Sequence, residues 1–294
     1  MGSGPRRRLV GGLLGGLAAG LFGTTALRAV AQIPGAGGAR PATEYVPVFG
    51  QTGKDVGWVP TPPALIEKML AAAGVTAKDL VIDLGSGDGR IPIAAARLFG
   101  AQAVGVEYEA NLVEYSKAEA ARQGVSDKAS FVRGDVFEHD FSRATVIALY
   151  LLPNMNLRLR PKILAMAPGT RVVAHNFGLG DWEPDEGVFA DEVRGWLWIV
   201  PAQAGGEWRS APGAARGADM GMSIRQRFQK VEGSVRAGGR TLQMLFPALR
   251  AGRIEFTTLD GSERRDYVGE VQGARITGTV RSNGGEPQPW SMQR

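Results

Sequence analysis

The chain of 294 residues contains no cysteine and only two histidines, His139 and His175. The absence of cysteine excludes disulfides, thiolate zinc sites, iron–sulfur clusters and cysteine nucleophiles. Two histidines leave little material for a transition-metal site, so we expect no metal-based chemistry. The remaining composition is ordinary: 44% of the residues are hydrophobic and 21% are charged, which is typical of a folded globular protein and excludes disorder throughout.

The net charge of +5 is distributed unevenly along the sequence. Residues 1–31 hold four arginines and no acidic residue, and residues 205–294 hold 14 Lys and Arg against 9 Asp and Glu. The segment between them, residues 32–204, is acidic, with 16 Lys and Arg against 20 Asp and Glu. Because little net charge remains once the first 31 residues are set aside, the sequence does not indicate a nucleic-acid partner.

The first 31 residues have the pattern of an export signal. Arg6–Arg8 precede an uncharged run, Leu9–Leu27, and residues 29–31 (AVA) have the small-x-small pattern of a signal peptidase site. We therefore expect cleavage after Ala31 and a periplasmic protein, and the paired arginines resemble a twin-arginine signal. An uncleaved membrane tether through residues 9–27 is the alternative, although six glycines in that run weaken it. A cytoplasmic protein with a loose apolar tail is a third interpretation.

The rest of the sequence divides into a linker at residues 32–55, an α/β domain at 56–204 and a β-rich accessory domain at 220–294. In the α/β domain short apolar runs alternate with helical patterns, which is typical of a parallel sheet covered by helices on both faces. We predict its strands at 80–83, 103–107, 130–133, 145–150, 171–177 and 196–200. The predicted helices lie at 62–73, 89–99, 110–123 and 155–166.

In the first predicted helix, Thr61 is expected to be the N-cap and Pro62 the first helical residue. Its buried face is expected to hold Leu65, Ile66, Met69 and Leu70.

The pattern changes after about residue 205. Residues 205–219 are rich in Gly and Ala and mark the expected boundary. Beyond them, short segments alternate between polar and apolar residues, which favours a small antiparallel sheet or partial barrel. The strands are predicted at 222–228, 241–246, 253–259, 266–271, 275–281 and 289–293.

Residues 81–90 (VIDLGSGDGR) form the most informative stretch, a strand that leads through a glycine turn into a helix. Such a turn lets a ligand approach the backbone closely. A dinucleotide site would have the spacing Gly-x-Gly-x-x-Gly, whereas here it is Gly-x-Gly-x-Gly with Asp83 and Asp88 on either side. Two carboxylates would repel a diphosphate but suit a cationic ligand, which disfavours a nicotinamide-dependent oxidoreductase.

These residues resemble the class I S-adenosylmethionine-dependent methyltransferases, whose first motif is an acidic strand end followed by Gly-x-Gly-x-Gly. The second and third motifs follow in order: Glu107 ends the next strand, where the family binds the ribose hydroxyls, and Asp135 follows the third, where the family contacts the adenine amino group. The resemblance implies a seven-stranded Rossmann-like fold and S-adenosyl-L-methionine as cofactor. The cofactor-binding residues it implies are Asp83, Gly85, Ser86, Gly87, Asp88, Gly89, Glu107, Asp135 and Val136.

A narrower resemblance covers roughly residues 56–165. Residues 58–62 (WVPTP), together with the glycine motif, resemble the protein-lysine methyltransferases related to the mitochondrial enzymes that modify the c-ring protein of ATP synthase and the adenine nucleotide carrier. The chain departs from that pattern by its export signal, by Glu107–Glu109 (EYE) after the second strand and by its added β region.

The residues expected at the methyl acceptor follow the fourth and fifth strands. Residues 150–154 (YLLPN) stand where enzymes that methylate adenine or amide nitrogen carry (Asn/Asp)-Pro-Pro-Tyr, and the absence of that tetrapeptide favours an amine acceptor. Tyr150 and Asn154 are candidates for orienting the acceptor. The alternative is that Tyr150 packs within the strand and Asn154 caps the following helix. His175 is a candidate for taking a proton, with Asp181 orienting it or holding a cationic substrate. A purely structural His175 is the alternative.

The sequence thus predicts a methyltransferase that acts on a nucleophile of a protein or small molecule, and it favours a protein lysine. The rival hypothesis is a methyltransferase-like scaffold that has lost turnover and binds partners through its C-terminal β domain.

Overall fold

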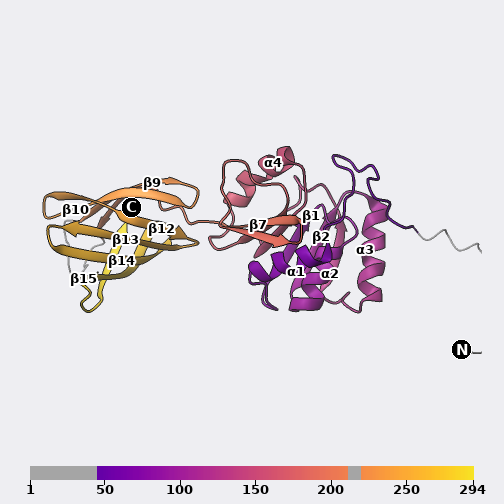
Figure 1. The fold of residues 1–294 in the computed structure, drawn as a ribbon, viewed down its shortest axis with the longest axis horizontal. Coiled ribbons are helices and arrows are strands. Elements are labelled where there is room, and N and C mark those ends of the chain that lie inside the picture. The colour runs from indigo at the N-terminus through magenta and orange to yellow at the C-terminus, as the bar shows by residue number, and fades with distance from the viewer. Residues whose placement is uncertain (1–44, 211–219) are drawn as a thin grey trace, which may run out of the picture. The chain divides into compact units, whose positions relative to one another are not determined.

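Two β-sheets organise the part of the chain that the computed structural model describes, residues 45–210 and 220–294. The first sheet has seven strands and the second has nine. The helices of the described residues all accompany the first sheet (Figure 1). The predicted α/β fold followed by an antiparallel β region is therefore confirmed.

The first sheet is built from strand–helix units. Its strands are β1 (Leu80–Leu84), β2 (Gln102–Glu107), β3 (Ala129–Arg133), β4 (Val146–Leu149), β5 (Arg171–His175), β6 (Glu186–Ala190) and β7 (Val193–Ile199). Its helices are α1 (Pro63–Ala72), α2 (Arg90–Phe99), α3 (Ala110–Arg122) and α4 (Pro153–Leu164).

The strand order of this sheet is β3-β2-β1-β4-β5-β7-β6. Strands β1 to β5 pair in parallel, and β7 is antiparallel to β5 and β6. The order reverses between β1 and β4, and doubly wound sheets bind their ligands at the carboxyl ends of the strands at such a point.

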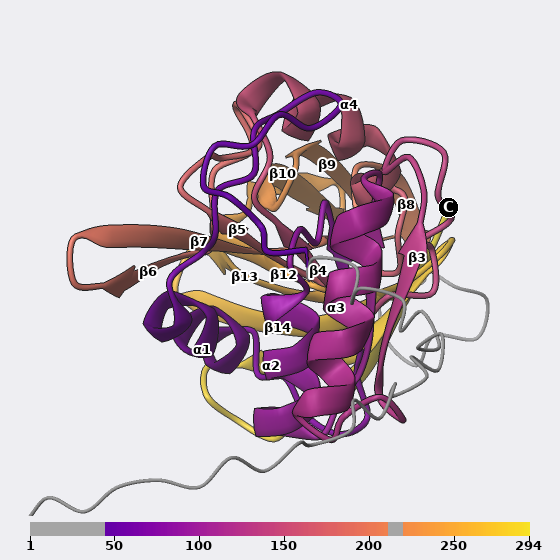
Figure 2. The same cartoon turned by 90° about the vertical axis from the view of Figure 1, so that its right-hand side faces the viewer.

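Alternate residues of the central strands face opposite helices. Ile82 packs in one core with Leu159 of α4, whereas Val81 packs in another core with Leu65 and Leu70 of α1. Figure 2 shows α1, α2 and α3 beside one another and α4 apart from them. The predicted buried face of the first helix is confirmed, because its apolar residues are all at most 2% exposed.

A loop, rather than a helix, connects β5 to β6. The loop, residues 176–185, buries Trp182 completely against the first sheet, and its main-chain oxygen accepts a hydrogen bond of 2.8 Å from Trp198 Nε1. The Trp182 indole, beside that of Trp198 from β7, thus covers the sheet where a crossover helix would otherwise lie.

The second sheet is entirely antiparallel, in the order β11-β10-β9-β8-β16-β15-β14-β13-β12. Its strands are β8 (Gly206–Ser210), β9 (Gly221–Arg227), β10 (Lys230–Ala237), β11 (Arg240–Gln243), β12 (Leu245–Arg250), β13 (Arg253–Asp260), β14 (Glu263–Gln272), β15 (Arg275–Ser282) and β16 (Gln288–Gln293). It has its own core, in which Phe256, Tyr267 and Trp290 are at most 5% exposed.

The turn between β9 and β10 contacts the loop that follows β5. Phe228, which has a φ of 54°, lies 5.9 Å from Trp182 between ring centroids at an interplanar angle of 20°. Arg227 pairs with Asp181 on one side of this contact, and Lys230 pairs with Glu183. Arg227 and Gln229 both donate hydrogen bonds to this loop, to Asp181 Oδ2 and Glu183 O.

Candidate functional site

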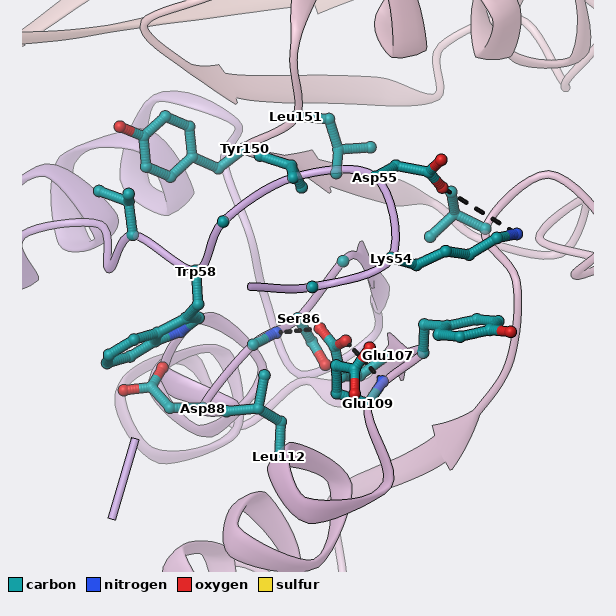
Figure 3. A pocket seen from close by; sticks show the side chains of 18 of the residues that line it. Lys54, Asp55, Trp58, Ser86, Asp88, Glu107, Glu109, Leu112, Tyr150 and Leu151 are labelled. Atoms are coloured by element: carbon teal, nitrogen blue, oxygen red, sulfur yellow. Dashed lines mark hydrogen bonds and ion pairs between the residues drawn. The ribbon is translucent and has the colours of Figure 1, made fainter. Parts of the chain in front are cut away.

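A pocket opens at the carboxyl ends of β1, β2, β3 and β4. The empty space in the pocket and its open mouth together is about 880 Å³. One wall comes from these strand ends and the loops that follow them, and the other comes from residues 51–61 (Figure 3). We name residues 51–58 the strap, because the sequence interpretation placed most of them in a linker whereas the structure lays them along the pocket.

Two backbone hydrogen bonds close the base of the strap. Gly50 N donates to Trp58 O at 2.9 Å, and Trp58 N donates to Gln51 O at 3.0 Å. The Gln51 side chain accepts from Val48 N and donates to the Tyr45 hydroxyl, so the chain before the strap is fixed as well.

The glycine turn after β1 is tightly packed by the protein itself. Gly85, Gly87 and Gly89 all have positive φ, which favours glycine. A Cβ at Gly87 would lie 2.6 Å from the indole nitrogen of Trp58, and one at Gly89 would lie 2.7 Å from Phe131. The glycines are therefore required by the turn and by their own neighbours, and all but Gly89 line the pocket.

Glu107 is positioned by two backbone hydrogen bonds at the end of β2. Its Oε2 accepts from Gly87 N at 2.8 Å and its Oε1 from Glu109 N at 2.9 Å (Figure 3). The residue is 9% exposed and lines the pocket. Each carboxylate oxygen keeps a further lone pair, so the group can still accept from two neighbouring hydroxyls.

Asp83 and Ser86 have buried polar side chains without partners among the described residues. Asp83 is 2% exposed, and its carboxylate makes no hydrogen bond or ion pair with any residue that the structure describes. Burial raises the pKa of Asp83 well above its usual value, and the charges of Glu107 and Asp88 raise it further. Ser86 Oγ is also buried, and no described residue hydrogen-bonds to it.

Asp88 and Asp135, in contrast, already have cationic partners. Asp88 accepts from Arg90 Nε at 2.9 Å and from Arg90 Nη2 at 2.6 Å. Asp135 pairs with Lys54 of the strap, which lies 4.8 Å from the centroid of the Tyr108 ring. The hydrogen bond from Lys54, followed by that from Phe137 N, lowers the pKa of Asp135. Both carboxylates line the pocket, but each forms an ion pair with a basic side chain.

The lining of the pocket holds more acidic than basic residues. Its basic residues are Lys54 and Arg90, and its acidic residues are Asp55, Asp83, Asp88, Glu107, Glu109 and Asp135. This excess of carboxylates favours cations over polyanions.

These open groups fit S-adenosylmethionine, which carries a cationic sulfonium and amino group and a ribose diol. Glu107 would accept from the ribose hydroxyls, the unpaired Asp83 would face the cationic end, and buried Val136 would pack against the base. The Ser86 hydroxyl supplies a polar contact that the protein does not use.

Tyr150 stands at the other end of the pocket, directly after β4. Its ring lies against the His175 imidazole, with 3.9 Å between centroids, and His175 Nδ1 lies 3.1 Å from Thr61 Oγ1. Burial raises the pKa of Tyr150 and lowers that of His175, so both groups are uncharged at neutral pH. The structure therefore brings together two of the four residues predicted at the acceptor, Tyr150 and His175.

The other two, Asn154 and Asp181, lie elsewhere. Asn154 is exposed on the first turn of α4 and does not line the pocket, because the helical period turns Met155 inward instead. Asp181 is exposed and pairs with Arg160 and Arg227 rather than with His175. The hydrogen bonds from Arg227 and Arg160 lower the pKa of Asp181 to about 2. Asp181 therefore links the β5–β6 loop to α4 and β9.

The sequence interpretation missed the contributions of Lys54, Trp58 and Thr61 to the pocket. Residues 58–62 carry part of a family resemblance, but the pattern alone assigns them no place in the site, and it predicts Thr61 as the cap of α1. The N-cap is Pro62, and the Thr61 side chain bonds to His175 instead.

Comparison with known proteins agrees with this geometry. Residues 83–186 match the family described as ANTKMT methyltransferase domain. The chain is 43% identical over 139 residues to a protein-lysine N-methyltransferase of Saccharolobus islandicus, covering 47% of this chain and 86% of that protein. It is 33% identical over 121 residues to the adenine nucleotide translocase lysine N-methyltransferase of Mus musculus, covering 41% of this chain and 53% of that protein.

One similar solved structure is described as an RNA methyltransferase, from Salinibacter ruber in complex with S-adenosyl-L-homocysteine. Its identity to this chain is 45% and its TM-score 0.48, and the match covers 49% of this chain and 95% of that one. The match to the Saccharolobus protein, spanning most of that relative, establishes the family. The chain therefore belongs to the S-adenosylmethionine-dependent methyltransferases, in the family that contains this protein-lysine N-methyltransferase.

Proposed function

We propose that this methyltransferase transfers the methyl group to a lysine side-chain amine of a protein. The observation that carries the proposal is the combination of an anionic pocket with an aromatic ring, Tyr150, at its acceptor end. An aliphatic ammonium is attracted by both the carboxylates and the ring face. The lysine methyltransferases among the relatives support the same acceptor.

The bound cofactor supplies a methyl group on its sulfonium, which a nucleophile displaces in line. A lysine ammonium has a pKa of about 10.4 in water and must lose its proton before its nitrogen can attack. Uncharged Tyr150 and His175 add no net charge beside that nitrogen. The hydroxyl of Tyr150 makes no hydrogen bond to a described residue, so it is free to accept from the acceptor N–H.

The proposal is tested by adding methyl-labelled cofactor and the purified enzyme to a cell extract. We expect the label in a protein band that is removed by protease and is unaffected by ribonuclease. Mass spectrometry should locate the label on lysine. Glu107→Ala should abolish labelling, whereas Glu114→Ala, on an exposed glutamate paired with Lys117, should not. Label that ribonuclease removes, or that mass spectrometry finds on residues other than lysine, would refute the lysine proposal.

We further propose that residues 1–31 direct export of the enzyme. The support is in the sequence: three consecutive arginines, an uncharged run over residues 9–27 and small residues at Ala29 and Ala31. These residues, including the alternative membrane tether, lie outside the part of the chain that the structure describes. Within that part, no helix is long and apolar enough to cross a membrane.

A further inference from the structure

Three residues from separate elements meet behind the acceptor end of the pocket. Thr61 precedes α1, Tyr150 follows β4, and His175 ends β5. Thr61 and His175 are 3% and 6% exposed, whereas the Tyr150 ring reaches the pocket. Figure 3 shows the Tyr150 side chain on the same side of the pocket as Trp58, away from Glu107.

The contacts run in one line from Thr61 to Tyr150. Thr61 is held by its main-chain oxygen, which accepts from Arg90 Nη1 at 2.9 Å. Its hydroxyl lies 3.1 Å from His175 Nδ1, and the imidazole lies against the Tyr150 ring at an interplanar angle of 35°. Phe177 extends the stack, with 6.4 Å between its centroid and that of Tyr150.

Helix capping does not account for Thr61. The N-cap of α1 is Pro62, and no side chain caps the helix. The bond to His175 is the only one the Thr61 hydroxyl makes with a described residue, and it fixes one ring nitrogen and the rotation of the imidazole. A ring fixed in this way offers a rigid face to Tyr150.

We propose that Thr61 and His175 are positioning residues that hold the Tyr150 ring in place to receive the aliphatic amine of the methyl acceptor. This inference rests on the proposed function, and it names the groups that select an amine. Cations bind aromatic faces with useful strength when partly desolvated, and the strength depends on the position of the ring. Removal of the Thr61 hydroxyl should therefore weaken amine binding while leaving the cofactor end unchanged.

The two histidines of the chain make the test specific. The full-length protein, loaded with S-adenosylhomocysteine, is titrated with n-butylammonium as a lysine side-chain mimic while the histidine ring signals are followed by NMR. We expect butylammonium to shift the His175 signals and to leave those of His139, in the turn after β3, in place. Tyr150→Ala should abolish the shift.

Substitutions at Thr61 test the positioning role. Thr61→Val keeps the shape but loses the hydroxyl, and butylammonium affinity is expected to fall about three- to tenfold, comparable with the loss of a cation–π contact. Thr61→Ser should restore it. Thr241→Val, on an exposed threonine of β11, is the matched control and should have no effect. Calorimetry should find the same affinity for S-adenosylhomocysteine in the wild type and in the three threonine variants, which shows that the fold is intact.

Two outcomes would overturn the inference. In the first, the wild-type protein binds S-adenosylhomocysteine, but butylammonium does not shift the His175 signals. Tyr150 then does not receive an amine. Thr61→Val with wild-type butylammonium affinity gives Thr61 no positioning role. Failure of the proposed function looks different, because the amine would still bind while the labelling experiment found another acceptor.

Discussion

Glu107 is the residue on which cofactor affinity should depend most. Its carboxylate is buried, is held by Gly87 N and Glu109 N, and has lone pairs open to the pocket. Glu107→Gln keeps the shape but loses the charge, and we expect the affinity for S-adenosylmethionine to fall about ten- to hundredfold, corresponding to about 1.5–3 kcal/mol. Isothermal calorimetry measures the change, with Glu114→Gln as control. Unchanged affinity in a folded Glu107→Gln protein would remove Glu107 from the cofactor site.

Asp79 should make the free energy of unfolding depend on pH. Burial by itself would raise the pKa of Asp79, but hydrogen bonds from Arg171, Thr145 and Thr76 outweigh it and bring the pKa from 3.8 to about 2. A lowered folded-state pKa contributes stability that is present above the unfolded value of 3.8 and is lost as pH falls towards about 2. The contribution is about 2 kcal/mol, because one pKa unit corresponds to about 1.4 kcal/mol.

Urea unfolding between pH 5 and pH 2, which spans these two pKa values, measures this contribution. Wild type should lose about 2 kcal/mol more than Asp79→Asn over this range, because the variant has no carboxylate to protonate. Asp127→Asn, on an exposed carboxylate, is the control. Parallel curves for wild type and Asp79→Asn would show that the network around Asp79 adds no stability.

Individual site residues were predictable from sequence where a backbone rule fixes their place. Glu107 and Asp135 follow parallel strands, and the carboxyl ends of such strands meet at one edge of the sheet. Thr61, Lys54 and Asp181 were not predictable, because their roles depend on partners far away in the chain. Thr61 meets a residue 114 positions away and Lys54 one 81 positions away, and no local pattern indicates such pairs.

At the scale of elements, the β9–β10 turn should contribute measurably to stability. Phe228 adopts a φ of 54°, which costs a bulky residue energy, while its ring packs on Trp182 and under Arg160. Phe228→Ala loses the ring and keeps the strain, so we expect a loss of about 1–3 kcal/mol. Phe228→Gly also loses the ring but relieves the strain, and should be less destabilised than Phe228→Ala.

Urea unfolding followed by tryptophan fluorescence measures both Phe228 variants. The expected order of stability is wild type, then Phe228→Gly, then Phe228→Ala. If Phe228→Ala is as stable as wild type, the stacking on Trp182 contributes nothing.

Elements with strong periodicity were predicted within a few residues, and short or irregular ones were not. The four predicted helices all exist, and the strands at 80–83 and 103–107 differ from β1 and β2 by one residue at one end. The predictions omitted β6, β8 and β10, of which β8 lies in the stretch taken as a boundary. The predicted strand 241–246 is wrong as a single strand, because the chain leaves β11 at Gln243 and enters β12 at Leu245.

For the whole molecule, export is the property open to a direct test. If residues 1–31 are a signal, the mature protein should begin at or near Gln32, because the AVA pattern ends at Ala31. N-terminal sequencing of the protein from its native cells measures this. Replacing Arg6, Arg7 and Arg8 by Lys should trap precursor if the twin-arginine route is used. A protein that keeps Met1 and remains in the cytoplasm would contradict the prediction.

The pairing of β8 with β16 has a consequence for the order in which the second sheet folds. Every other neighbouring pair in that sheet is consecutive along the chain, whereas β16 meets β8 across a long separation: Met292 pairs with Ser210 and Gln293 with Arg209. Hairpins close quickly, and a pairing across so long a stretch of chain carries a larger entropic cost. This seam should therefore close last. If the rate-limiting step precedes its closure, stopped-flow kinetics should show that substitutions in it accelerate unfolding and leave the folding rate nearly unchanged.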